Sequence, residues 1–119
     1  MKVGELFWVN LDPTVGDEIQ KKRPVLVLNG GHEKNLKLAI VVPVTSYATA
    51  WEHNPFFVPL IPSEHNGLTK KSAIDCFQIR AISHNRFGEK IGIIDVDSMD
   101  LVKTAVALIL DMEPQHCTY

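Results

Sequence analysis

The chain has 119 residues, of which 45% are hydrophobic and 22% are charged, and its formal net charge is −2. This length fits one domain, and the composition excludes a disordered tail, a collagen-like fibre and a disulfide scaffold. Residues 91–119 carry five acids against Lys103, so the first ninety residues have a small positive balance. An anionic partner is therefore expected at local clusters and not in a global positive field.

Targeting and cofactor signals are missing from the sequence. Residues 1–5 contain a glycine and an acid where a signal peptide has a long apolar run, and no uncharged apolar stretch reaches the roughly 18 residues of a membrane helix. Cys76, Cys117 and the five histidines show no metal-ligand spacing. We therefore expect a single cytoplasmic domain over residues 1–119, with no metal and no other cofactor.

Most of the chain is typical of short strands. Residues 4–11 alternate moderately and are rich in aromatic and β-branched side chains, and a turn at residues 12–16 follows. Residues 24–28 and 36–45 are continuously apolar, as in strands buried on both faces, although Pro43 predicts an edge or a bulge. Further strands are predicted at residues 56–61 (an edge strand), 72–82 and 91–94.

The last predicted element is a helix. We expect Asp97 or Ser98 to cap it, with Asp100 in the first turn and Pro114 past its end. Its apolar side chains recur at helical spacing: Leu101, Ala105, Leu108, Ile109 and Met112. Five or six strands and one helix predict a mainly β fold, a small barrel or curled antiparallel sheet covered by the C-terminal helix.

The polar connection at residues 12–24 is the first candidate for chemistry, because loops of this length are usually functional. Arg23 adjoins a proline at the entrance of a buried strand, where its guanidinium could clamp a phosphate with two hydrogen bonds. Asp17 or Glu18 would hold that guanidinium or take a proton from a hydroxyl. The alternative is a solvated hairpin loop of mixed charge.

Two further groups follow the second apolar run. The Thr45 hydroxyl can donate to a phosphate oxygen or, as is commoner, to the backbone. Tyr47 and Trp51 lie in residues 46–55 and can stack on unpaired bases, although Trp51 can equally pack on the barrel.

These residues carry a resemblance to a known family. The run GELFWVNLDPTVGDEIQKKRPVLVLN resembles the opening of the MazF/PemK/Kid family of toxin endoribonucleases, through the turn at residues 12–16, Glu18 and residues 23–25. The run VVPVTS, which contains Thr45, resembles the second signature of the family. The run FQIRAIS, which contains Gln78, resembles a third signature.

The resemblance implies an SH3-like barrel with a C-terminal helix, the MazF/CcdB-like toxin fold. It implies a homodimer that cuts single-stranded RNA without a metal, by attack of a 2′-hydroxyl on the adjacent phosphate, and that is blocked by a cognate antitoxin. Arg23 and Thr45 match the catalytic pair of the family, and we add Glu18 to them as a candidate catalytic residue. We expect the remaining RNA-binding residues to be Asp17, Lys21, Lys22, Trp51, Asp75, Phe77 and Gln78.

Two positions depart from the family pattern. Asp17 stands where relatives often have His, and Phe77 stands where many have an acid before the Gln. Asp75 lies two residues earlier, on the same face of a strand, and is the candidate replacement for that acid. Phe77 either faces the core, through a bulge that changes the strand register, or stacks on a base in the RNA groove; we favour the groove.

Two other functions remain open from the sequence. Gyrase-inhibiting toxins share this fold, so the chain could be a non-nuclease binding module, and Phe77 also fits a catalytically impaired relative. The presence of Arg23 and Thr45 together favours the nuclease. The antitoxin is expected to contribute a segment that is disordered alone, lying across residues 12–23 and 46–55.

Overall fold

A computed structural model describes residues 1–11, 15–17, 22–31 and 36–112. Within these ranges the chain forms seven strands, two short 3-10 helices and one α-helix. The strands are β1 (Glu5–Asn10), β2 (Lys22–Asn29), β3 (Leu38–Ser46), β4 (Phe57–Leu60), β5 (Ser72–Asp75), β6 (Arg80–Ser83) and β7 (Phe87–Ile93). The helices are η2 (Thr49–Trp51), η3 (His84–Arg86) and α1 (Val96–Ile109).

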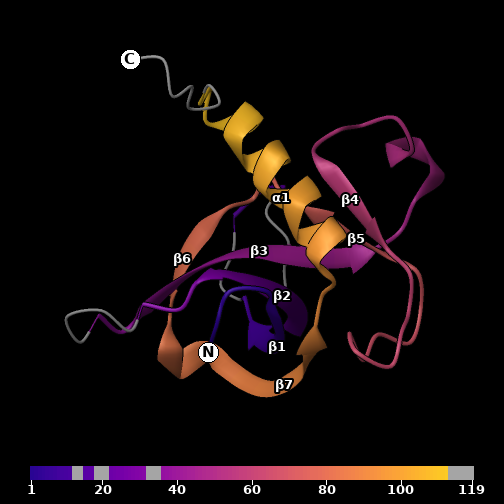
Figure 1. Cartoon of the computed structure of the whole chain (residues 1–119). Helices are drawn as coiled ribbons and strands as arrows, with labels where there is room; N and C mark the ends of the chain where they lie inside the picture. Colours follow the sequence, from indigo (N-terminus) through magenta and orange to yellow (C-terminus); the bar gives the residue numbers. More distant parts are fainter. Residues whose placement is uncertain (12–14, 18–21, 32–35, 113–119) are drawn as a thin grey trace.

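The strands form one curled antiparallel sheet in the order β4-β5-β3-β2-β1-β7. The long strand β3 pairs with β2 along one edge, while its other edge pairs first with β6 and then with β5. Figure 1 shows β3 crossing the molecule, with β6 beside one half and β5 beside the other. The predicted mainly β fold is confirmed, with seven strands instead of five or six, and β4 is an edge strand as expected.

The single strand predicted at residues 72–82 is wrong, because the chain turns at residues 76–79 and forms β5 and β6. Asp75 makes this turn: its Oδ1 accepts from the backbone N–H of Phe77 at 3.1 Å, and its backbone carbonyl accepts from the N–H of Gln78 at 3.4 Å. Side-chain acceptance of this kind competes with strand pairing. Cys76 and Ile79 continue the apolar pattern through the turn, which hides the break in the sequence.

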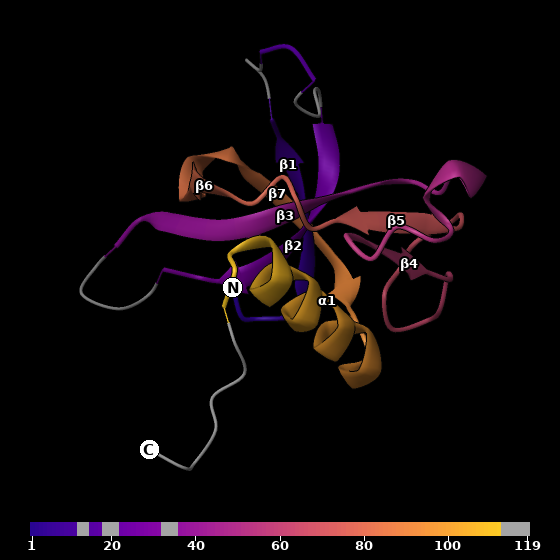
Figure 2. The same ribbon diagram turned by 90° about the horizontal axis from the view of Figure 1, so that it is seen from above.

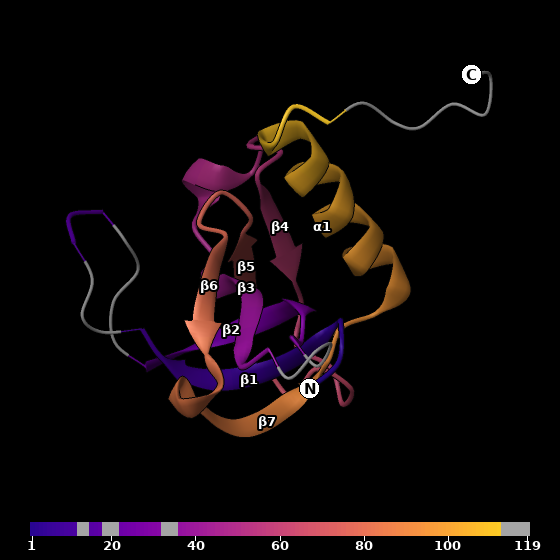
Figure 3. The same cartoon turned by 90° about the vertical axis from the view of Figure 1, so that its left-hand side faces the viewer.

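The core consists of two clusters on the two faces of the central strands. Val25, Val27, Val41 and Val42 are fully buried, so the first apolar run and the second half of the second run are covered on both sides, whereas Leu36, Leu38 and Ile40 are exposed at the start of the second run. One cluster lies under α1 and includes Leu26, Val42, Val44, Leu60 and Val102, and the other is built around Val9, Val25 and Val41. Figures 2 and 3 show α1 lying alongside one face of the curled sheet, next to β4.

The cap of the helix lies two or three residues before the predicted Asp97 or Ser98. Asp95 is the N-cap, and its carboxylate accepts from the Ser98 backbone N–H at 2.9 Å and from the Ser98 hydroxyl at 2.7 Å. Both hydrogen bonds lower the pKa of Asp95, and the one from the Ser98 hydroxyl has the larger effect. Asp97, predicted as a cap, instead lies in the first turn.

The buried face of α1 also differs from the predicted one. Val102 and Ala105 are buried, and Met99, Val106 and Ile109 pack against the same cluster. Of the predicted stripe, Leu101, Leu108 and Met112 are exposed. The apolar face is therefore wider than the core that it covers, and the buried part is turned by about one residue position from the stripe read in the sequence.

Pro43 lies in a central strand, so the predicted edge position is wrong. It is buried within β3, at the last residue pair of the β2–β3 ladder, and opposite the gap where the partner on the other edge changes from β6 to β5. A proline has no N–H to donate to a ladder, and Pro43 lies where the pairing with β2 ends on one edge and the pairing partner changes from β6 to β5 on the other. Across the described residues, no helix is long and apolar enough to cross a membrane.

Candidate functional site

The candidate site lies where β2 and β3 part. Their last pair is Val25 opposite Pro43, and the same register continued by two residues would set Arg23 opposite Thr45. The strands diverge instead: β2 stays on β1, with Arg23 opposite Val9, while β3 stays on β5, with Thr45 opposite Ala73. Pro24 and Pro43 both lack an N–H, so the sequence itself weakens the ladder at this point.

A pocket of about 380 Å³ opens between the diverging strands. β1, β2, β3 and β7 contribute Trp8, Lys22, Arg23, Pro24, Val44, Thr45, Ser46 and Ile91 to its walls. The segment between β4 and β5 contributes Gly67, Leu68, Thr69 and Lys70, and β5 contributes Ser72. The pocket therefore joins residues that are far apart in the sequence, among them Arg23 and Thr45, which both line it.

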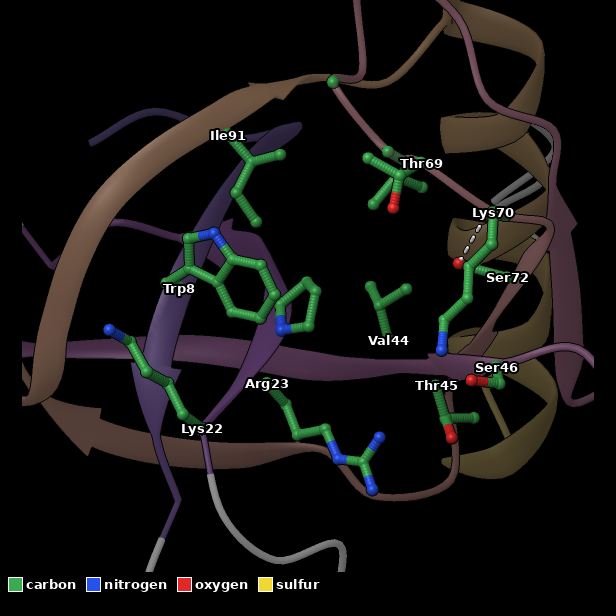
Figure 4. Close-up of a pocket in the computed structure, with 13 residues that line it drawn as sticks. Trp8, Lys22, Arg23, Val44, Thr45, Ser46, Thr69, Lys70, Ser72 and Ile91 are labelled. Atoms are coloured by element: carbon green, nitrogen blue, oxygen red, sulfur yellow. Dashed lines mark hydrogen bonds between the residues drawn. The ribbon is translucent and has the colours of Figure 1, made fainter.

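The walls of the pocket differ in chemistry. Figure 4 shows Trp8 and Ile91 on one side, and Thr45, Ser46 and Lys70 on the other, with the Arg23 side chain extending below them. Guanidinium, ammonium and hydroxyl groups are hydrogen-bond donors, and the first two carry positive charge, which suits a phosphate. The indole of Trp8 offers an apolar face of the kind on which a nucleic-acid base stacks.

Arg23 and Thr45 owe their positions to strand alternation. Residues two apart in a strand share a face, so Arg23 continues the face of the buried Val25, and Thr45 continues that of Val41. Both side chains are half-buried at the open end of these faces. They therefore stand on rigid strands whose inner residues are fixed in the core.

The other predicted site residues do not line this pocket, except for Lys22. Asp17 is exposed, and Glu18 and Lys21 lie outside the described residues. The Trp51 ring stacks on Phe57, with ring centroids 4.3 Å apart and an interplanar angle of 5°, so it packs on the barrel. The buried Asp75 holds the turn after β5, where it accepts from Gln78 Nε2 at 2.8 Å.

Phe77 is 63% exposed, which rules out the core-facing alternative. It lies in the turn after β5 and outside the pocket, with its ring centroid 5.7 Å from that of Phe56. The ring is therefore accessible to RNA, as the favoured alternative requires, but it does not lie in this pocket. Its role, like those of Asp75 and Gln78, stays a prediction.

Trp8 and Thr69 were not predicted from the sequence, and Lys70 was considered only as one of two adjacent lysines that could touch a phosphate. Trp8 belonged to a predicted strand, but its neighbours across the pocket depend on how the sheet curls. From the sequence, these two lysines could touch a phosphate, but a solvated turn is the commoner outcome for such a pair; the closure of the sheet, which no local pattern encodes, brings Lys70 to the pocket. The two adjacent lysines and the glycine at position 67 were the available signals.

The thiol of Cys76 lies in the core and does not line the pocket. Burial and, to a smaller extent, the charge of Asp75 raise the pKa of the Cys76 thiol to about 12, so this cysteine stays protonated near neutral pH and is unsuited as a nucleophile. In the described ranges, no group of three His, Cys, Asp or Glu side chains is placed to hold a metal ion. Cys117 lies outside those ranges.

Comparison with known proteins gives consistent results. The family model described as the PemK-like, MazF-like toxin of type II toxin-antitoxin systems matches residues 2–110. Endoribonuclease PemK of Escherichia coli is 35% identical over 91 residues, which cover 76% of this chain and 66% of that protein. Endoribonuclease toxin MazF of Escherichia coli K12 is 28% identical over 109 residues, which cover 91% of this chain and 92% of the relative.

Solved structures from Deinococcus radiodurans share the fold. MazF alone has a TM-score of 0.77 at 28% identity, with 94% of this chain and 97% of that chain covered. A MazE-MazF complex has a TM-score of 0.71 at 25% identity, with 95% and 98% covered.

Proposed function

Because the chain belongs to the family of PemK-like, MazF-like toxins of type II toxin–antitoxin systems, we propose that its pocket cuts single-stranded RNA through Arg23 and Thr45, without a metal. The chain is an endoribonuclease of this family, as the relatives named above are. The alternative of a gyrase-poison-like binding module is therefore set aside. The observation that carries the proposal is the pocket between β2 and β3, which brings the predicted catalytic pair together.

The proposed reaction uses the nucleophile of the RNA itself. The 2′-oxygen of one nucleotide forms a bond to the adjacent phosphorus and loses its proton to a base, while the bond from phosphorus to the next 5′-oxygen breaks. That 5′-oxygen takes up a proton, so the products end in a 2′,3′-cyclic phosphate and a 5′-hydroxyl. DNA lacks the 2′-hydroxyl and cannot react in this way.

Arg23 and Thr45 would act on the phosphate. Negative charge develops on the phosphoryl oxygens as the 2′-oxygen attacks, and a guanidinium on a rigid strand stabilises that charge without having to reorganise. The Thr45 hydroxyl would donate to one of the same oxygens and help to hold the phosphate in line with the attacking and leaving oxygens. Lys22, at the same strand end as Arg23, adds positive charge to the mouth of the pocket.

The general base is the remaining role. Arginine is effectively always protonated and does not serve as that base. The catalytic candidate Glu18, which lies outside the described residues, and the exposed Asp17 are the acids closest to Arg23 in the sequence. We propose Glu18 for this role, and the Trp8 side of the pocket for a base of the RNA.

The test is a cleavage assay on single-stranded RNA in excess chelator, with the ends of the products identified. We expect cleavage to persist, Arg23→Ala to lower kcat by about 10²–10³-fold, as for a lost charge-stabilising donor, and Thr45→Ala to lower it by roughly tenfold. Arg86→Ala and Thr104→Ala are the matched controls, because neither residue lines the pocket. Activity that disappears with chelator and returns with magnesium would contradict the mechanism.

The proposed partners are an antitoxin and a second copy of the chain. The MazE-MazF complex supports the antitoxin. For a homodimer, the support is the outer face of α1 and the residues after it, where Leu101, Leu108, Leu110 and Met112 are exposed. The apolar run at residues 41–44 is buried within the chain, so it adds no surface to such an interface. Sedimentation at micromolar concentration should show twice the 13.3 kDa of the monomer, and a monomer alone would contradict the dimer.

A further inference from the structure

We propose that Lys70 is a further RNA-binding residue of the pocket, and that the folded segment at residues 61–71 holds it in place to bind a phosphate next to the one at Arg23. This inference rests on the proposed function, because it assigns a role at the same site. Lys70 lines the pocket, and Figure 4 shows its side chain extending toward the strand end that carries Thr45 and Ser46. Among the described residues, no carboxylate forms an ion pair with its ammonium group.

The backbone at Lys70 is fixed from two sides. The buried Ser72 donates its hydroxyl to the Lys70 carbonyl at 3.0 Å, which is the dashed line in Figure 4. The backbone N–H of Tyr47 donates to the Lys71 carbonyl at 3.2 Å. The Cα of Lys70 is therefore tied to the end of β3, the strand that carries Thr45.

The segment before Lys70 is organised by Asn66, which is only 5% exposed. Its Oδ1 accepts from the backbone N–H groups of Ser63 and Leu68, each at 3.0 Å, and its Nδ2 donates to the Ile61 carbonyl at 2.9 Å. The Ser63 hydroxyl in turn accepts from the Asn66 N–H at 3.2 Å. One amide side chain thus replaces the hydrogen bonds that a strand or helix would provide.

Two glycines let this segment pack directly on β7. A Cβ at Gly67 would lie 2.3 Å from the Ile91 carbonyl oxygen, and one at Gly92 would lie 2.3 Å from the His65 carbonyl oxygen. The Ile93 N–H donates to the same His65 oxygen at 2.8 Å. The backbone of residues 65–67 therefore contacts the backbone of β7 directly, so the wall that carries Lys70 is already in place without RNA.

The neighbouring Lys71 is engaged elsewhere. Its ammonium lies 3.9 Å from the centre of the Tyr47 ring, and it does not line the pocket. Two adjacent lysines with the same charge thus differ in environment. A lysine ammonium is a compact charge with three donors, which suits a phosphate whose orientation is not fixed as strictly as that of the reacting one.

The experiment compares Lys70→Gln with Lys71→Gln, which remove the same charge one residue apart. The probe is a single-stranded RNA that the wild type cuts, with a 2′-deoxy nucleotide 5′ to the cleaved bond so that it binds without reacting. We expect Lys70→Gln to weaken binding roughly tenfold and to reduce the slope of log affinity against log salt by about 0.7. KM for the cleavable RNA should rise with little change in kcat, Lys71→Gln should change affinity less than about threefold, and Lys70→Arg should retain binding.

Binding by Lys70→Gln equal to that of the wild type overturns the inference, as does an equal loss in Lys71→Gln, which would show only a general electrostatic effect. The role of the segment is tested with Asn66→Ala, alone and combined with Lys70→Gln. If Asn66 acts by placing Lys70, the double variant binds no worse than either single variant, whereas additive losses overturn that step. Failure of the wild type to cut RNA at all would instead refute the proposed function.

Discussion

Replacing Gly67 with alanine tests whether the segment at residues 61–71 is rigidly attached to β7. Gly67 has a φ of +67°, a conformation that costs an L-residue roughly 1–2 kcal/mol. The new Cβ would also lie 2.3 Å from the Ile91 carbonyl oxygen, and no side-chain rotation relieves a clash with backbone. The segment must therefore move off β7 and weaken the hydrogen bond between Ile93 and His65, which adds about 1 kcal/mol.

The expected loss is about 2–3 kcal/mol of unfolding free energy, or roughly 8–12 °C in Tm for a domain of this size. Gly4→Ala is the matched control, because Gly4 has a φ of +91° but the atom nearest to the added methyl group would be Ile93 Cγ1, at an ordinary 3.9 Å. Denaturant unfolding of both variants measures the difference. RNA affinity of folded Gly67→Ala should also fall, because Thr69 and Lys70 move with the segment. A loss no greater than that of Gly4→Ala would refute the reasoning.

Three further predictions concern the helix, the exposed aromatic and the antitoxin. Asp95→Ala should lower the free energy of unfolding by about 1 kcal/mol at pH 7. Because the folded-state pKa of Asp95 is lowered, the wild type should lose this contribution as the pH falls through that pKa. Asp95→Asn still caps the helix and should show no such loss. Phe77→Ala should change stability by less than about 1 kcal/mol, and should weaken binding only of RNA long enough to leave the pocket; equal weakening for a dinucleotide would contradict this. Hydrogen exchange in an antitoxin complex should protect residues 12–23 and 46–55, and protection confined to α1 would show that this placement is wrong.

The sequence predicted those parts of the fold whose signal is local. Residues 24–28 and 41–44 are apolar at every position, and Val25 and Val41 within them are fully buried. The cap of α1 was harder, because Asp95, Asp97 and Ser98 can all serve. The choice depends on pairing elsewhere: the Ile94 N–H donates to the Gly4 carbonyl at 3.0 Å, so the sheet holds the chain up to that residue and Asp95 is the first one left to cap the helix.

The proposed catalytic pair could be named from the family resemblance, since Arg23 directly precedes one apolar run and Thr45 directly follows another. Their neighbours were not, because Trp8 and Lys70 reach the pocket only through tertiary structure. The prediction for Asp75 illustrates the opposite error. Strand alternation placed its carboxylate with Phe77 on one face, but alternation ends where a side chain begins to bond its own backbone, and Asp75 does so at the N–H of Phe77.

The pocket follows from the way in which this sheet is built. β4 and β7 are the two end strands of the curled sheet, and the segment after β4 connects them. It does so through the hydrogen bond that the Ile93 N–H of β7 donates to the His65 carbonyl. The same sheet has to open where β2 and β3 part at their prolines, and the covering segment passes that opening with Lys70 on its inner side. Strands thus place Arg23 and Thr45, while a loop places Lys70. A sequence change in the loop should therefore alter RNA affinity and sequence preference while the charge stabilisation at the reacting phosphate remains, since the strands that carry it are anchored in the core.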